Sequence, residues 1–194
     1  DPMQLFDGNT LSGWAATGNV EGWVVDHGCI FCTAEKGKYL YYTEHQFQNF
    51  KLSLEFKHPP KTNSGVFLRW TDLNDPVQTG IEIQILDTYG REPATVKCCG
   101  AVYDLQAPTH NTCKPAGEWN HMVLYTNDNI IRVTLNDEKI VDMDLNRWTT
   151  PNQNPDGTPN KFKRAFCEMT EAGYIGLQDH GGQIWFRNIE IEKL

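Results

Sequence analysis

The chain has 194 residues, of which 17 are basic and 25 acidic, so its net charge is −8. That charge repels phosphate backbones, and no Lys/Arg cluster offsets it locally, which argues against nucleic acid as a partner. No apolar run has the length of a transmembrane helix, and no long linker divides the sequence. We therefore expect one domain, residues 1–194, with no transmembrane segment.

The first third of the chain reads as a series of short strands separated by turn signals. Phe50, Leu52, Leu54 and Phe56 alternate with polar residues, which is the pattern of a half-buried antiparallel strand. Pro59 and Pro60 end that strand. The expected strands are 22–26, 29–33, 39–42, 47–57 and 64–71.

Residues 80–89 read G-I-E-I-Q-I-L-D-T-Y and form the central stretch of the sequence. Isoleucines alternate with Glu82 and Gln84, so these two side chains point the same way. Asp87 lies at an odd offset from Glu82 and joins that face only if a β-bulge inserts one residue. Aligned carboxyl groups on a sheet suit acid/base chemistry. A solvated amphipathic edge strand explains the same alternation.

The rest of the chain continues the β pattern, interrupted by two long loops. Residues 90–118 lack periodicity, and long ordered loops on β scaffolds usually carry function. The loop 146–163 has oxygen-bearing side chains that could hold Ca²⁺, although it lacks EF-hand spacing and a plain turn-rich loop is the simpler interpretation. The expected strands here are 119–126, 130–135, 139–145, 174–179 and 183–193.

About twelve short strands at regular spacing predict an all-β sandwich. Two packed antiparallel sheets, with the first and last strands side by side, are the simplest architecture. Asn127-Asp128 and Asn136-Asp137 tolerate the positive φ of tight hairpin turns.

Six cysteines are an even number and more than a reduced cytosolic domain of this size usually carries, so we expect an oxidising compartment. The chain begins with Asp-Pro, as a processed secretory protein would. The C-x-x-C pair at Cys29 and Cys32 lacks further zinc ligands. Vicinal Cys98 and Cys99 can hardly bridge each other, so one of them pairs elsewhere, with Cys113 the nearest partner, or stays free.

Strand parity selects further candidates for a site around Glu82. Gln178 and His180 share an outward face, and His180 titrates near neutral pH, although a histidine in a turn is often only exposed. Arg69 could hold a substrate oxygen bidentately or could form a structural ion pair. Three residues at loop and strand ends could bind a sugar, unless the tryptophan belongs to the core: Asn63, Trp119 and Asn120.

The motifs taken together resemble the 3-keto-disaccharide hydrolase family, formerly a domain of unknown function. Those motifs are L-F-D-G-N-T-L-S-G-W at 5–14, N-S-G-V-F-L-R at 63–69, G-I-E-I-Q-I-L-D at 80–87, G-E-W-N at 117–120, and G-Y-I-G-L-Q-D-H-G with F-R-N-I within 173–189. The resemblance implies a concanavalin A-like jelly-roll sandwich and a carbohydrate substrate. It also implies a bacterial protein of the periplasm or cell surface, which could be a lipoprotein, and an upstream sugar 3-dehydrogenase.

The stretch E-I-Q-I-L-D also resembles the E-x-D-x-x-E strand of laminarinase-type glycoside hydrolases, with Glu82 and Asp87 at the two catalytic positions. Gln84 replaces the middle acid, which argues against ordinary retaining hydrolysis. Oxidation at C3 of a sugar acidifies the C2 proton, so a base can start an elimination instead.

We expect Glu82, Asp87 and His180 to divide the base and acid roles of such an elimination. Arg69 or a divalent cation such as Ca²⁺ or Mg²⁺ would stabilise the enolate oxygen. The same three residues could equally be metal ligands. Two rival hypotheses remain, a non-catalytic carbohydrate-binding module and an interaction domain of the laminin-G type.

Overall fold

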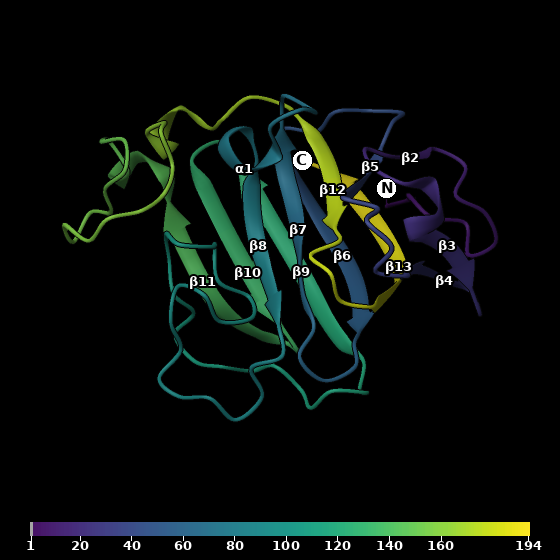
Figure 1. The fold of residues 1–194 in the computed structure, drawn as a ribbon. Coiled ribbons are helices and arrows are strands. Elements are labelled where there is room, and N and C mark those ends of the chain that lie inside the picture. Colours follow the sequence, from purple (N-terminus) through teal and green to yellow (C-terminus); the bar gives the residue numbers. More distant parts are fainter. Residues whose placement is uncertain (1) are drawn as a thin grey trace.

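A computed structural model describes residues 2–194 and shows two antiparallel β-sheets packed face to face (Figure 1). The prediction of an all-β sandwich with about twelve strands is confirmed, because thirteen strands form among the described residues. The larger sheet consists of β1 (Met3–Gln4), β3 (Trp23–Asp26), β4 (Cys29–Cys32), β6 (Phe50–Lys57), β9 (Asn120–Asn127), β10 (Ile130–Leu135), β11 (Glu138–Asp144) and β13 (Ile184–Lys193). The smaller sheet consists of β2 (Trp14–Ala16), β5 (Tyr39–Tyr42), β7 (Asn63–Trp70), β8 (Ile81–Leu86) and β12 (Tyr174–Gln178).

The strand order places distant segments of the chain side by side. The larger sheet runs β11-β10-β9-β6-β13-β4-β3, and the smaller runs β2-β5-β12-β7-β8. β1 pairs with β13, so the first and last strands are neighbours, as predicted. The short helices are α1 (Pro76–Thr79), η1 (Val20–Gly22), η2 (Leu145–Arg147) and η3 (Phe166–Glu168). None of the helices within residues 2–194 is long and apolar enough to cross a bilayer.

The core lies between the two sheets and follows the alternation of the sequence. Leu52, Leu54 and Phe56 of β6 are fully buried, whereas the residues between them are partly exposed. Ile81, Ile83 and Ile85 of β8 enter the same core. Burying such side chains stabilises the fold by roughly 1.5–3 kcal/mol each. The apolar residues of each strand therefore determine which of its two faces packs against the other sheet.

The tight hairpins form where Asn and Asp were expected. Asn136 and Asp137 both have positive φ, at 55° and 69°, between β10 and β11. Asp128 has a φ of 48° between β9 and β10. A short polar side chain tolerates this left-handed conformation better than a branched one does.

β8 is not the solvated edge strand that its alternation alone would allow. Backbone groups of residues 100–103 bond to its free side, with Gly100 N donating to Gln84 O at 2.8 Å and Tyr103 N donating to Glu82 O at 2.9 Å. Ile83 and Val102 form an isolated bridge in the same segment. The long loop 90–118 therefore covers the free edge of the smaller sheet.

All six cysteines are free thiols. Cys113 lies beside Cys99, so the structure brings together two of the three residues for which the sequence left the pairing open. Cys29 and Cys32 lie at the two ends of β4. No group of three or more His, Cys, Asp or Glu side chains within residues 2–194 is arranged to hold a metal ion.

Candidate active site

A pocket of about 210 Å³ lies on the outer face of the smaller sheet. Its walls come from β5, β7, β8 and β12, with contributions from α1 and both long loops. The lining residues are Tyr39, Asn63, Val77, Glu82, Gln84, Tyr103, Lys161, Gln178 and His180. Five of them, Glu82, Gln84, Gln178, His180 and Asn63, are candidates named from the sequence.

The register of the sheet explains why these side chains meet. Gly65 lies opposite Gln84, and Phe67 lies opposite Glu82, in an unbroken β7–β8 ladder. A Cβ added to Gly65 would come 3.2 Å from Gln178 Oε1 and 3.3 Å from Glu82 Oε2. These two oxygens converge on one small space, which is open because Gly65 has no side chain.

Glu82 is the titratable group at the floor of the pocket. The residue is only 9% exposed. Burial raises the pKa of its carboxyl group from 4.5 to about 7, and the nearby Lys161 ammonium lowers it in part. Desolvation disfavours the charged form of a carboxyl group, and no hydrogen bond contributes to the shift. A group with this pKa can accept or release a proton near neutral pH.

Gln84 and Gln178 present acceptor oxygens beside this carboxyl group. Gln84 Nε2 donates to Lys97 O at 3.2 Å, and Gln178 Nε2 donates to the Tyr39 hydroxyl at 3.4 Å. Both Oε1 atoms are buried and have no hydrogen-bond partner within residues 2–194. Buried acceptors are normally satisfied, so the floor of the pocket is suited to a ligand that brings hydrogen-bond donors.

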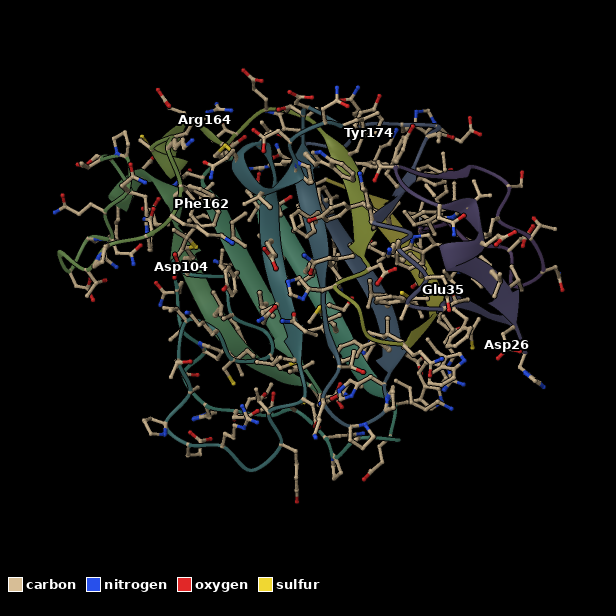
Figure 2. The ribbon with its side chains drawn as sticks, viewed as in Figure 1. Asp26, Glu35, Asp104, Phe162, Arg164 and Tyr174 are labelled. Carbon is tan, nitrogen blue, oxygen red and sulfur yellow. The ribbon has the colours of Figure 1, made fainter. Side chains whose placement is uncertain are left out.

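Lys161 and Tyr103 reach the pocket from the two long loops. The Lys161 ammonium lies 4.7 Å from the centre of the Tyr103 ring, and Lys161 N donates to Asp104 Oδ2 at 3.0 Å. Figure 2 shows Asp104 and Phe162, which flank this contact, on the same side of the molecule. Tyr103 is fixed in turn by its backbone bond to Glu82 O.

His180 and Asn63 complete the rim. His180 is exposed and lies two residues beyond the end of β12. The preceding Asp179 accepts from Gly37 N and from Gly181 N, each at 2.9 Å, which fixes the turn that carries His180. The imidazole of His180 is therefore in contact with solvent.

Asp87 lies outside the pocket, and the bulge expected before it is absent from the β7–β8 ladder. The register runs without interruption from Asn63↔Leu86 to Leu68↔Ile81, so parity turns Asp87 away from Glu82. Its Oδ2 atom accepts from Lys61 N at 2.9 Å. The structure thus brings Glu82 and His180 together but not Asp87.

Arg69 also lies elsewhere, which corrects its expected place on the polar face beside Glu82. Its φ of 51° accompanies a register shift between β7 and β12, which breaks the regular alternation. The side chain is 1% exposed. Its guanidinium donates to Gln48 O, Asp128 O, Met169 O and Asn49 Oδ1 at 2.8–3.1 Å. Arg69 therefore has a structural role, because its hydrogen bonds hold three loops together.

Trp119 and Asn120 are likewise placed away from the pocket. The Arg187 guanidinium lies 3.6 Å from the centre of the Trp119 ring, beside the larger sheet. Asn120 Oδ1 accepts from Lys114 N and Asn136 Nδ2, so Asn120 holds the hairpin and the long loop together. Neither residue is among those that line the pocket.

Four lining residues were not candidates from the sequence: Tyr39, Val77, Tyr103 and Lys161. Tyr39 could have been predicted from the strand order, because it lies directly opposite Gln178 in the β5–β12 pair. Lys161 and Tyr103 belong to loops without periodicity, so no pattern places them. Val77 lies in the short helix α1, whose four residues are too few to show a helical periodicity.

Comparisons with known proteins agree with this fold. A Bacillus subtilis protein of unknown function with a galectin-like fold has a TM-score of 0.63 at 12% identity, over all of this chain and 94% of that one. That likeness shows the fold alone, and it confirms the predicted jelly-roll type of sandwich. A Parabacteroides distasonis protein, provisionally described as a glycosyl hydrolase, has a TM-score of 0.90 at 34% identity over the whole of both chains.

Sequence comparisons identify the family. A 3-keto-disaccharide hydrolase of Bacteroides thetaiotaomicron is 28% identical over 226 residues, which cover 99% of this chain and 78% of that protein. The family model of the 3-keto-alpha-glucoside-1,2-lyase-like domain matches residues 1–192. The chain therefore belongs to the 3-keto-alpha-glucoside-1,2-lyase-like domain family.

Proposed function

We propose that this chain cleaves 3-keto-glycosides, including 3-keto-disaccharides, by removing the proton at C2 and eliminating the group at C1. The observation that carries this proposal is the buried carboxyl group of Glu82, whose pKa is raised to about 7 at the floor of a polar pocket. The name of the 28% identical relative supports the substrate class. The provisional description of the 34% identical Parabacteroides distasonis protein as a glycosyl hydrolase supports glycoside cleavage.

Glu82 acts as the base. In a sugar oxidised at C3, the C2 proton is acidic because its electron pair can move onto the C3 oxygen. Glu82 takes this proton, and the electron pair then forms a C1=C2 double bond as the bond from C1 to the leaving oxygen breaks. A base with a pKa near 7 is well matched to this task at neutral pH.

Lys161 takes the electrostatic role that the sequence suggested for Arg69 or a cation. Negative charge develops on the C3 oxygen, and an ammonium group in the pocket stabilises it more in the transition state than in the ground state. The free amide oxygens of Gln84 and Gln178 accept hydrogen bonds from sugar hydroxyl groups and hold the ring over Glu82. A divalent cation at the cleft stays a prediction.

His180 serves as the acid at the open rim. The leaving oxygen takes up a proton as it departs, and the side chain of His180 at the rim supplies it. Water then adds at C1 of the enone, and a proton returns to C2. The sum is hydrolysis without net oxidation, so the substrate must already be oxidised by a sugar 3-dehydrogenase that acts earlier. A periplasmic or cell-surface location is part of the same proposal.

The proposal is tested with a 3-keto-disaccharide and its unoxidised parent, each incubated with wild type, Glu82→Gln and Glu44→Gln. Glu44 is exposed and outside the pocket, so Glu44→Gln is the matched control. We expect release of monosaccharide only from the oxidised sugar, and its loss in Glu82→Gln alone. Incubation in D₂O should place deuterium at C2 of the released 3-keto sugar.

Two outcomes would contradict the proposal. Full activity in Glu82→Gln would remove Glu82 from the mechanism. Saturable binding of both sugars without any turnover would instead support a carbohydrate-binding module, which the same type of sandwich also forms.

A further inference from the structure

A second cavity, of about 380 Å³, lies next to the candidate active site. Leu86 and Thr88 form its floor at the end of β8 and just beyond it. The loop after β8 forms its walls, with Arg91, Glu92, Lys97 and Cys98 among the lining residues. No residue of this cavity takes part in the chemistry proposed above.

The two cavities adjoin along one strand. Gln84 lines the first and Leu86 the second, and residues two apart on a strand face the same way, at about 7 Å. Asn63 lines the first cavity and is the direct cross-strand partner of Leu86. The hydrogen bond from Gln84 Nε2 to Lys97 O ties the floor of the first cavity to the wall of the second. The two cavities are therefore neighbours along β8.

The first pocket is too small to enclose a whole disaccharide. Its volume of about 210 Å³ is below the roughly 300–1,000 Å³ of pockets that enclose larger ligands. It suits one sugar ring over Glu82. The second ring of a disaccharide needs its own space, and the cavity of about 380 Å³ provides it.

The charge of the second cavity indicates what kind of ring fits. Arg91 and Lys97 are exposed at its wall, in a chain whose net charge is −8. Neither forms an ion pair with another residue of the described range 2–194. Glu92 in the same wall accepts from Asn111 N at 2.9 Å, so the wall holds two basic side chains against one acidic side chain. Asn111 Nδ2 also donates to Arg91 O at 3.0 Å and to Thr88 O, so the wall is held in place.

We propose that this second cavity is the subsite for the leaving group, and that Arg91 and Lys97 select a leaving group that carries a carboxylate, such as a uronic acid. This inference rests on the proposed function. Two unpaired cations at the wall attract an anionic ring, and a planar guanidinium can bind a carboxylate bidentately.

Three substrates test the inference on the intact chain. They are methyl 3-keto-glucoside, a neutral 3-keto-disaccharide, and a 3-keto-disaccharide whose leaving group is a uronic acid. In the wild type we expect the highest kcat/KM for the acidic disaccharide and the lowest for the methyl glycoside. The preference for the acidic over the neutral disaccharide should weaken as salt is raised, because exposed charges are screened.

The matched variants are Arg91→Gln/Lys97→Gln and the control Lys51→Gln/Lys193→Gln, whose lysines lie on β6 and β13 of the other sheet. The first pair should reduce the acidic-over-neutral ratio of kcat/KM by about fourfold or more, since each exposed charge pair contributes roughly two- to fivefold. The control pair should keep the ratio. Thermal unfolding midpoints of both double variants show whether either has lost its fold.

The outcomes separate this inference from the proposed function. Equal kcat/KM for the acidic and neutral disaccharides, or an unchanged ratio in Arg91→Gln/Lys97→Gln, overturns the subsite while cleavage itself upholds the proposed function. Failure of the wild type to cleave any of the three substrates overturns the proposed function and the subsite with it.

Discussion

Gly65 and Gln84 face each other across the β7–β8 ladder, and the missing side chain of Gly65 leaves the space in which Glu82 and Gln178 converge. A glycine of the sheet thus lies at the centre of the candidate site. Its neighbours Val66 and Leu68 belong to the apolar core on the other face of β7. One strand therefore supports the core with one face and opens the pocket with the other.

Gly65→Ala should impair turnover without unfolding the protein. The added methyl group would lie 3.2 Å from Gln178 Oε1 and 3.3 Å from Glu82 Oε2, so both side chains must shift by a few tenths of an ångström. We expect kcat/KM for a 3-keto-disaccharide to fall about tenfold or more, because small misplacements of reacting groups are costly. A normal thermal midpoint with normal kcat/KM would contradict the proposed floor.

Glu82 should make activity and stability depend on pH in opposite directions. A base must be ionised, so kcat/KM should rise with pH through about 7. Burial of the ionised carboxylate is unfavourable, and the folded-state pKa lies above its ordinary 4.5. The contribution of Glu82 to stability is therefore fully present below about 4.5 and is lost as pH rises through about 7, by up to about 3 kcal/mol.

Glu82→Gln tests the stability half of this prediction. Urea unfolding at pH 5 and pH 8 should show that the variant gains stability over the wild type at pH 8, while it loses activity. At pH 5 the difference should be small. The same pH dependence in both proteins would show that Glu82 is not the titrating group.

Lys161→Gln should reduce the rate and move the acidic limb of the pH profile. The Lys161 ammonium lowers the pKa of Glu82, so its removal lets that pKa rise further above 7. The midpoint of the kcat/KM profile should shift to higher pH, and kcat should fall about tenfold or more as the enolate oxygen loses its counter-charge. Lys163→Gln, an exposed lysine two residues away that does not line the pocket, is the control. An unshifted midpoint would remove Lys161 from the site.

Asp87→Asn should leave cleavage of a 3-keto-disaccharide within about twofold of wild type. The Asp87 side chain bonds to Lys61 N outside the pocket, and an amide oxygen can accept the same hydrogen bond. In a retaining hydrolase that used Glu82 and Asp87 as its pair, this change would be as damaging as Glu82→Gln. Initial rates of the two variants side by side separate the mechanisms.

Arg69→Met should destabilise the fold and leave substrate affinity unchanged. The substitution removes the guanidinium donor from four oxygens. Gln48 O and Asn49 Oδ1 keep one donor each, from Thr126 Oγ1 and Asp128 N, whereas Asp128 O and Met169 O lose the guanidinium donor. We expect a loss of at least about 3 kcal/mol in the free energy of unfolding. Below its melting temperature the variant should keep the KM of the wild type. A raised KM with normal stability would show that Arg69 binds the substrate.

Alternation along the strands was enough to predict the sandwich, the pairing of the first and last strands, and the common face of Glu82 and Gln84. The physical reason is local, because a strand has a period of two and its apolar side chains must face the core. Turn positions such as Asn136-Asp137 were predictable for the same reason, since positive φ favours few residue types.

Only the tertiary structure determined which polar side chains meet in the pocket and how deeply they are buried. At Arg69 a bulge in β7 breaks the regular alternation, so the side chain does not point to the face predicted for it. At Asp87 the expected bulge is absent, so regular alternation turns this side chain away from Glu82. The burial of Glu82, and hence its raised pKa, depends on the edge of β8 being covered by a segment some twenty residues away. Lys161 and Arg91 reach their cavities on loops, whose paths follow from contacts that no periodicity in the sequence encodes.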